Sequence, residues 1–192
     1  METKATYFDK AGNQNTDTTL AAAKRRALEL GIKTIVVASS TGKTGIKAME
    51  VFKGFNLVIV SHVTGFRGVN TQEFTDENRK LLESNGIPVI TMTHAFGGVS
   101  KAMKYKFDMI DIGDIIANSL YIFGQGIKVC CETVMMAADA GKIKVSEDVI
   151  AIGGTGKSGG SDSAAVITAV NSQYFFDMNV KEIICKPVYY AV

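Results

Sequence analysis

Short apolar runs rich in β-branched residues recur along the chain and alternate with helical patterns, and this alternation constrains the fold more than any other feature. The first three runs are expected as strands at about 34–38, 57–61 and 88–92, with helices near 44–53 and 75–85 between them. Strands that alternate with helices form a parallel sheet with helices on both faces, joined by right-handed crossovers. The chain is therefore predicted to be an α/β protein.

The remaining segments are predicted to be mainly helical. Asn15 or Thr16 can cap a first helix, and Gly31 ends it. A fourth strand is expected at 148–152. Three consecutive helices are expected before this strand, at about 99–105, 111–123 and 126–140. After it we expect a helix at 161–171 and a last strand at 182–185. No linker or low-complexity segment interrupts this order, so residues 1–192 are predicted to form a single domain.

The composition argues against several classes of partner. The 21 basic and 19 acidic residues form no block of one sign, so the chain has no electrostatic footprint for nucleic acid. Neither a signal peptide nor an apolar run of membrane-spanning length is found, and the three cysteines and two histidines lack metal-ligand spacing. We expect a soluble, cytoplasmic protein with reduced structural thiols, without a metal site and without a nucleic-acid or membrane partner.

Two glycine-rich loops, 39–45 and 153–160, follow strands at equivalent places. The first contains Thr41-Gly42-Lys43-Thr44-Gly45 and the second Thr155-Gly156-Lys157-Ser158-Gly159, and a third relative lies at Thr64-Gly65-Phe66-Arg67-Gly68. Each of the first two is expected to lead from a strand into a helix, which would direct backbone N–H groups and a positive helix end at one spot. Anion binding at these two loops is the favoured interpretation, and turns that merely connect elements are the alternative.

The loops differ from the phosphate-binding loop of ATP- and GTP-hydrolysing enzymes. That motif needs a glycine five residues before its Gly-Lys-Ser/Thr, and Val37 and Ala151 occupy those positions. Binding a single phosphate group requires fewer protein groups, namely two or three N–H groups, a hydroxyl and a lysine. The sequence therefore favours phosphate binding without nucleotide hydrolysis.

Several polar and aromatic side chains follow the expected strands or flank the loops. His62 and His94 come at the carboxyl ends of strands, where ligands of open parallel sheets bind, and each can contact a ligand or make a structural hydrogen bond. Phe66 and Arg67 can act as an aromatic platform and an anion clamp, or simply as a lid. Lys128 and Glu132, one helical turn apart, form either a solvated ion pair or a ligand-facing pair.

Nucleophilic catalysis has no support from spacing. Ser39 and Ser40 have no histidine and acidic residue at a recognisable triad spacing.

Taken together, these segments resemble a known family. The chain resembles the C-terminal α/β domain of pyruvate kinase and, over nearly its whole length, the small stand-alone archaeal and bacterial proteins described as pyruvate-kinase α/β-domain-like. The resemblance rests on residues 15–18, 34–44, 65–67, 93–95, 124–132, 137–141 and 149–155.

This resemblance implies a three-layer α/β/α sandwich on a five-stranded, mostly parallel sheet with strand order 3-2-1-4-5 and an antiparallel last strand. That order would bring loops 39–45 and 153–160 together. In some pyruvate kinases the corresponding loops hold the phosphates of a sugar-bisphosphate effector. Carried over by position, this implies ligand contacts for Ser39, Thr41, Gly42, Thr44, Thr155, Gly156 and Lys157.

Two departures limit the transfer. The chain lacks the catalytic barrel of pyruvate kinase, and its second loop lacks the aromatic-arginine pair of the effector loop.

The expected function is binding of a phosphate-bearing small molecule, with a mononucleotide such as FMN favoured as cofactor, between loops 39–45 and 153–160. The alternatives are a sugar-phosphate-responsive regulatory module that forms homo-oligomers, and an enzyme that uses His62 or His94 as acid or base. The predicted ligand-binding residues are Ser39, Ser40, Thr41, Gly42, Lys43, Thr44, His62, Gly65, Phe66, Arg67, Thr93, His94, Lys128, Gly153, Gly154, Thr155, Gly156 and Lys157.

Overall fold

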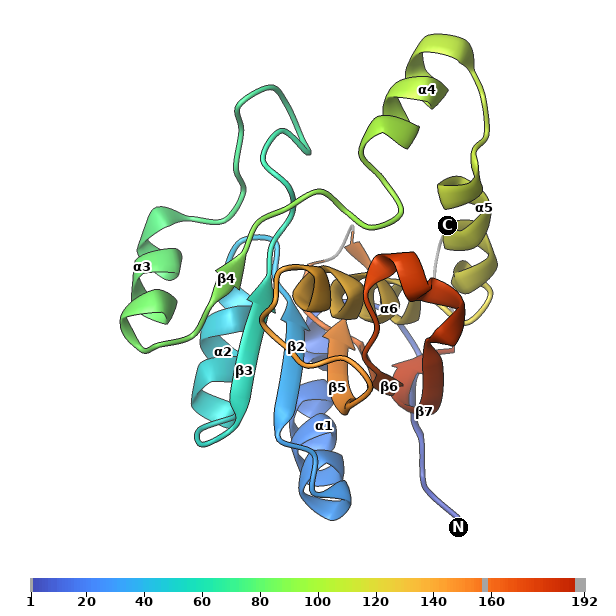
Figure 1. Cartoon of the computed structure of the whole chain (residues 1–192). Helices are drawn as coiled ribbons and strands as arrows, with labels where there is room; N and C mark the ends of the chain where they lie inside the picture. Colours follow the sequence, from blue (N-terminus) through green and yellow to red (C-terminus); the bar gives the residue numbers. More distant parts are fainter. Residues whose placement is uncertain (1, 157–158, 189–192) are drawn as a thin grey trace.

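One mixed β-sheet forms the centre of the protein (Figure 1). The structure is a computed structural model that describes residues 2–156 and 159–188. Within these residues the sheet has seven strands in the order β1-β7-β6-β5-β2-β3-β4. Their bounds are Thr6–Phe8 (β1), Thr34–Ala38 (β2), Asn56–Val60 (β3), Val89–Ile90 (β4), Asp148–Gly153 (β5), Ser163–Thr168 (β6) and Asn179–Pro187 (β7).

The parallel half of the sheet agrees with the prediction. β2 pairs in parallel with β3 on one side and with β5 on the other, with Ile35 opposite both Leu57 and Ile150. β4 continues the parallel arrangement beyond β3. The first and fourth predicted strands are thus neighbours, and the loops that follow them leave the sheet at the same edge.

The prediction of five strands with a helix at 161–171 is wrong. That segment contains β6, which is antiparallel to both β5 and β7, so β7 runs in the same direction as β5 instead of opposing it. β1 adds a further parallel strand beyond β7. Ala164 and Ala165 are compatible with a helical pattern, but here they are fully buried between the layers of the fold, and strand pairing with burial overrides the weak local preference.

Helices cover both faces of the sheet. α1, α2 and α3 contribute Leu20, Ala48, Leu82 and their neighbours to one apolar cluster, whereas α6 packs against the opposite face through a second cluster that contains Ile127 and Val134. The helices are Thr16–Leu30 (α1), Lys43–Val51 (α2), Asp76–Ser84 (α3), Val99–Phe107 (α4), Ile112–Tyr121 (α5) and Gln125–Asp139 (α6), and 3₁₀ turns span Asn13–Asn15 and Ser172–Asp177.

The amino-terminal turn of α6 lies unusually close to the sheet. A Cβ atom at Gly153, the last residue of β5, would lie 2.5 Å from the backbone carbonyl oxygen of Gly126. Glycine at this position therefore permits the start of α6 to approach the carboxyl end of β5. This contact matters for the site, because it fixes where α6 begins.

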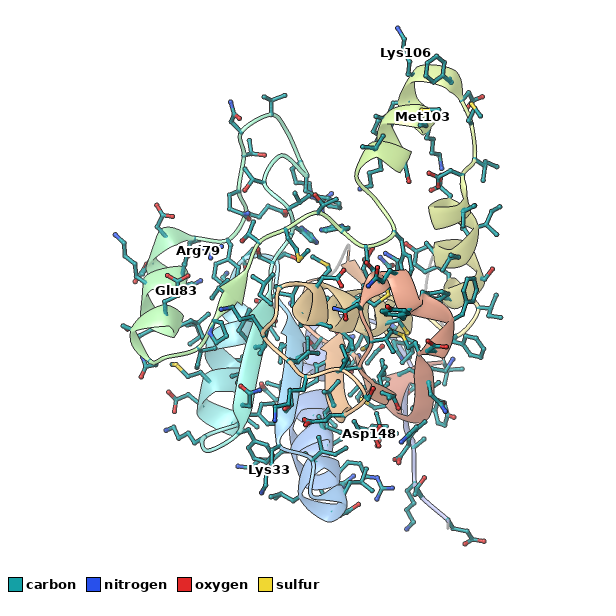
Figure 2. The ribbon with its side chains drawn as sticks, in the orientation of Figure 1. Lys33, Arg79, Glu83, Met103, Lys106 and Asp148 are labelled. Carbon is teal, nitrogen blue, oxygen red and sulfur yellow. The ribbon has the colours of Figure 1, made fainter. Side chains whose placement is uncertain are left out.

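α4 projects away from the rest of the fold, whereas α5 returns toward α6 (Figure 1). None of the residues of either helix is buried, and large apolar side chains such as Tyr105 and Ile112 are 85% and 75% exposed. Figure 2 shows Met103 and Lys106 on α4, far from the sheet. Among the described residues, no helix has the length and apolar character needed to cross a membrane.

Candidate functional site

A cavity of about 740 Å³ opens at the carboxyl edge of the sheet, above β2, β3 and β5. It brings residues of the first loop together with residues that follow β3, β4 and β5. The predicted site residues that line it are Ser39, Ser40, Thr41, Lys43, Thr44, His62, Phe66, Arg67, His94, Lys128, Gly154 and Gly156.

Other predicted residues do not line the cavity. Thr155 is buried at 6% exposure, and its hydroxyl oxygen has no hydrogen-bond partner among the described residues. Lys157 lies outside the described residues. The described residues that were predicted but are not part of the lining are Gly42, Gly65, Thr93, Gly153 and Thr155.

Three helices begin at this cavity. Thr16 of α1, Lys43 of α2 and Gln125 of α6 are each the first residue of their helix, and all three line the cavity. The first N–H groups of a helix have no partner within it, and the helix dipole adds positive potential there. From the sequence, helix starts were predicted at this edge for α2 and for a helix after the second loop. The second of these helices does not exist, because loop 153–160 leads into the strand β6. The starts of α1 and α6 lie at the cavity instead.

The first loop is held rigidly by α3. The carbonyl oxygen of Thr41 accepts hydrogen bonds from Asn78 Nδ2 (2.9 Å) and from the backbone N–H of Thr75 (3.4 Å). Gly42 has φ +94°, and a Cβ there would lie 2.5 Å from Cβ of Asn78, so only glycine fits. Among the described residues, the backbone N–H groups from Thr41 to Thr44 have no acceptor. These N–H groups are therefore available to a ligand.

The second loop is anchored by a buried carboxylate that sequence reasoning missed. Asp162 is fully buried, and its Oδ2 accepts hydrogen bonds from the backbone N–H groups of Gly12 (3.0 Å) and Thr155 (3.3 Å). Its Oδ1 accepts a hydrogen bond from the hydroxyl of Ser163 (3.0 Å). Nearby, the N–H of Ser161 donates to Thr16 Oγ1 (3.0 Å). These contacts fasten the loop to the start of α1.

Lys128 and Glu132 form a buried ion pair in the cavity wall. Lys128 Nζ lies 2.5 Å from Glu132 Oε2, and the two side chains are only 11% and 7% exposed. Glu132 Oε1 also accepts a hydrogen bond from the N–H of Phe96 (3.2 Å). The solvated ion pair that the sequence allowed is therefore wrong. The pair is buried and faces the cavity, and ligand contact by it stays a prediction.

Rings gather on the opposite side of the cavity. Phe66 stacks against His62 with 4.2 Å between ring centroids and against His94 with 5.1 Å. Lys101 Nζ lies 4.2 Å from the centroid of Phe66, and the guanidinium of Arg67 lies 5.3 Å from it. The cluster therefore presents an aromatic surface edged with positive charge.

His94 is held in the neutral form. Burial lowers the pKa of His94 to about 4, against the opposing effect of Glu132, and the positive charges of Lys101 and Lys128 add to the lowering. The N–H of Val63 donates to His94 Nε2 (3.3 Å), a bond that only an unprotonated Nε2 can accept. His94 thus acts as a hydrogen-bond acceptor at neutral pH.

This lowered pKa predicts a loss of stability in acid. An unfolded His titrates near 6.5. Between about pH 6.5 and pH 4, His94 therefore binds a proton in the unfolded chain but stays unprotonated in the folded protein. The His94→Gln variant keeps an acceptor without titrating. Between pH 7 and pH 4.5 the wild type should lose about 1–2 kcal/mol more unfolding free energy than the variant, allowing for screening at the partly exposed ring. Urea unfolding at both pH values measures this, and equal losses would refute it.

The three cysteines have no part in the site. Cys130, Cys131 and Cys185 are fully buried, and burial raises the pKa of each thiol, to about 12 for Cys131 and about 11 for Cys185. Thiols with such pKa values are poor nucleophiles at neutral pH. Their environment agrees with the expected role as structural residues.

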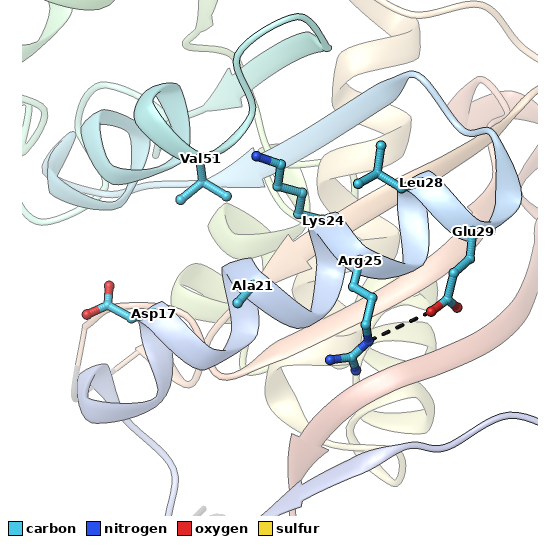
Figure 3. A pocket seen from close by; sticks show the side chains of 7 residues that line it. All are labelled: Asp17, Ala21, Lys24, Arg25, Leu28, Glu29 and Val51. Atoms are coloured by element: carbon cyan, nitrogen blue, oxygen red, sulfur yellow. Dashed lines mark ion pairs between the residues drawn. The ribbon is translucent and has the colours of Figure 1, made fainter.

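A second depression lies on the outer surface of α1 and α2 (Figure 3). Arg25 and Glu29 form an exposed ion pair along its edge, with 3.9 Å between Nε and Oε1. Lys24 and Leu28 also line it. The glycine-rich loops do not line this depression. Lys24 to Arg26 would be expected to form a solvated helix face, but Arg26 is only 14% exposed and pairs with Glu182, with 2.8 Å between Nη2 and Oε2.

Comparison with known proteins places the chain in a family. The model of the pyruvate kinase alpha/beta domain matches residues 17–167. Among solved structures, the chain is similar to Cryptosporidium parvum pyruvate kinase in complex with ADP, with 13% sequence identity and a TM-score of 0.44. That match covers 81% of this chain but only 24% of the pyruvate kinase chain. This protein belongs to the pyruvate kinase alpha/beta domain family.

Proposed function

We propose that the protein binds a phosphate-bearing small molecule in the cavity at the carboxyl edge of the sheet, with FMN favoured. The observation that carries this proposal is the meeting of three helix starts, those of α1, α2 and α6, at one cavity. Free N–H groups at the starts of α2 and α6 can bind phosphate oxygens, and the dipoles of all three helices add positive potential at the same place.

The remainder of the cavity suits a planar ring. Phe66, Phe96 and Tyr121 contribute aromatic faces, and Lys43 and Lys101 contribute positive charge. A volume of about 740 Å³ lies within the range of roughly 300–1,000 Å³ typical of small-molecule sites. A mononucleotide would therefore have its phosphate at the helix starts and its ring against the aromatic side chains.

The proposal predicts that a negative charge at the first loop blocks binding. Thr41 is exposed and lines the cavity, so Thr41→Glu places a carboxylate beside the same N–H groups that would hold the phosphate. We expect FMN affinity, measured by flavin fluorescence titration, to fall at least 100-fold, equivalent to about 2.7 kcal/mol. Ser84→Glu, at an exposed residue in the last turn of α3 outside the cavity, is the matched control and should bind as the wild type does.

The choice of ligands separates the phosphate from the ring. Riboflavin has the ring system of FMN without its phosphate and should bind far more weakly, whereas a sugar bisphosphate tests phosphate recognition alone. The absorption spectrum and native mass spectrum of the purified protein report any retained ligand. Colourless protein with no thermal shift in the presence of FMN or other phosphorylated metabolites would refute the proposal.

A regulatory module that self-associates is the second candidate. Its support is the projecting α4 and the connection from α4 to the start of α5, where Tyr105, Ile110 and Ile112 are at least 72% exposed. Large apolar side chains gathered on one projecting segment are typical of contact surfaces between proteins. Homo-oligomer formation and cytoplasmic location both stay predictions.

A further inference from the structure

Ser40, His62 and Glu73 form a continuous chain of polar contacts beside the cavity. Ser40 Oγ lies 3.4 Å from His62 Nε2, and His62 Nδ1 lies 2.6 Å from Glu73 Oε2. The three residues come from different segments: Ser40 follows β2, His62 lies two residues beyond β3, and Glu73 lies in the loop before α3. A hydroxyl, an imidazole and a carboxylate in this order are the parts of a serine nucleophile with its general base and the group that orients the base.

The carboxylate of Glu73 determines which ring nitrogen of His62 carries the proton. Burial raises the pKa of Glu73, but the hydrogen bond from His62 and the nearby Arg67 outweigh this effect, and the pKa lies below its usual value. Glu73 is thus ionised at neutral pH, and its Oε2 accepts a hydrogen bond from Nδ1–H of His62 while its Oε1 accepts one from Nε–H of Arg67 (3.4 Å). Nε2 of His62 is then the acceptor, and it faces the hydroxyl of Ser40.

The loop around His62 is itself braced. Gln72 Nε2 donates to the carbonyl oxygen of His62 (3.1 Å), and Gln72 Oε1 accepts from the N–H of Phe74 (2.9 Å). Phe66 covers one face of the imidazole. The ring can therefore neither turn freely nor exchange its partner without moving these groups.

Ser40 also occupies a suitable backbone position. It comes after a buried parallel strand and shortly before a helix, a place where the neighbouring N–H groups face the same space as the side chain. The unpartnered N–H groups from Thr41 to Thr44 are candidates to hold the negative oxygen that develops when a serine attacks a carbonyl. Ser39 cannot take this role, because its buried Oγ accepts the N–H of Gly45 (3.2 Å).

We propose that Ser40 is a nucleophile for acyl transfer from small carboxylic esters, with His62 as general base and Glu73 as the positioning residue. Oγ of Ser40 attacks the ester carbonyl carbon while His62 Nε2 takes the hydroxyl proton. The bond from that carbon to the alcohol oxygen breaks, and the departing alcohol takes the proton from His62. Water then attacks the acyl-serine with the same assistance, which releases the carboxylic acid and restores Ser40.

This inference goes beyond the proposed phosphate binding and does not depend on it. The reagents that test it, phenylmethanesulfonyl fluoride and p-nitrophenyl acetate, carry no phosphate group. A protein that fails to bind FMN can therefore still be acylated at Ser40, and a protein that binds FMN can fail to be acylated. The test of Ser40 acylation therefore gives a result that is independent of the test of FMN binding.

The test combines labelling with kinetics. Peptide mapping by mass spectrometry after treatment with phenylmethanesulfonyl fluoride should find the sulfonyl group on Ser40. Release of p-nitrophenol should fall at least 100-fold in Ser40→Ala and in His62→Gln. In Glu73→Gln kcat should fall about tenfold or more with KM unchanged, because Gln carries no charge to stabilise the imidazolium that forms when His62 takes the proton of Ser40. A purely structural role of Glu73 would lower the midpoint of thermal unfolding without this selective loss of kcat.

The controls keep the outcome decisive. Ser84→Ala removes an exposed serine of α3 and should react as the wild type does. Thermal unfolding of each variant establishes that it is folded, and Ser40→Ala removes only one oxygen atom. Labelling at residues other than Ser40, or equal rates in wild type and Ser40→Ala, would overturn the proposal.

Discussion

Replacing Lys128 with Met should lower the free energy of unfolding by about 3–5 kcal/mol, because Glu132 would remain buried without its partner. Both side chains are almost completely buried, and their charged atoms are 2.5 Å apart. Met has a volume similar to that of the Lys stem, so little packing is lost and the unpaired carboxylate accounts for the effect. Urea unfolding of the wild type and the variant measures the difference.

Two further variants separate charge burial from other causes. Lys181→Met breaks a comparable pair with Asp148, but these side chains are 47% and 33% exposed, and the cost should be under about 1 kcal/mol. In the double variant Lys128→Met/Glu132→Gln, the buried charge is gone and Gln can still accept the N–H of Phe96. Most of the lost stability should return. A double variant no more stable than Lys128→Met alone would show that packing, not charge, explains the loss.

Local sequence patterns predicted the parallel half of the fold. Apolar β-branched runs locate β2, β3 and β5 to within a residue, and Thr75 and Gly31 mark helix ends as expected. These features are local, because a strand that is buried on both faces needs apolar residues throughout and a helix end needs a specific cap. The pairing of β2 with β5 was predicted from the family resemblance and not from local sequence patterns.

The antiparallel part could not be predicted in the same way. β6 begins with the small residues Ser163, Ala164 and Ala165, whose preference for a strand is weak, and its position depends on β5 and β7 on either side. β1 has three residues and pairs with β7 across almost the whole chain. Such pairings are determined by distant segments, so local patterns carry little information about them.

The helix starts at the site could have been found from the predicted elements. A helix that connects parallel strands runs antiparallel to them, so its first residue lies at the carboxyl edge of the sheet. Applied to the helices before β2 and β5, this rule would have identified Thr16 and Gln125. By contrast, the contact between Ser40, His62 and Glu73 depends on where loop 61–75 folds back, which no spacing rule supplies.

Replacing Asp162 with Ala should lower the free energy of unfolding by about 3–5 kcal/mol. This carboxylate is fully buried and accepts three hydrogen bonds, from the N–H groups of Gly12 and Thr155 and from the hydroxyl of Ser163. A buried donor left without an acceptor costs about 1–3 kcal/mol, and two of these donors are backbone groups that cannot turn away. Chemical denaturation at neutral pH measures the loss.

A graded series tests this explanation. Asp162→Asn keeps one oxygen acceptor for the two N–H groups, and its amide can donate to Ser163, so the cost should be only about 1–2 kcal/mol. Asp139→Ala is the control, because Asp139 accepts the N–H of Ser172 and the amide of Asn171 at the exposed end of α6 and should cost less than about 1 kcal/mol. If Asp162→Ala proved as mild as this control, the carboxylate would not be what fastens the second loop. If it is severe, FMN affinity should fall in parallel across the series, because the same residue holds loop 153–160 against the start of α1.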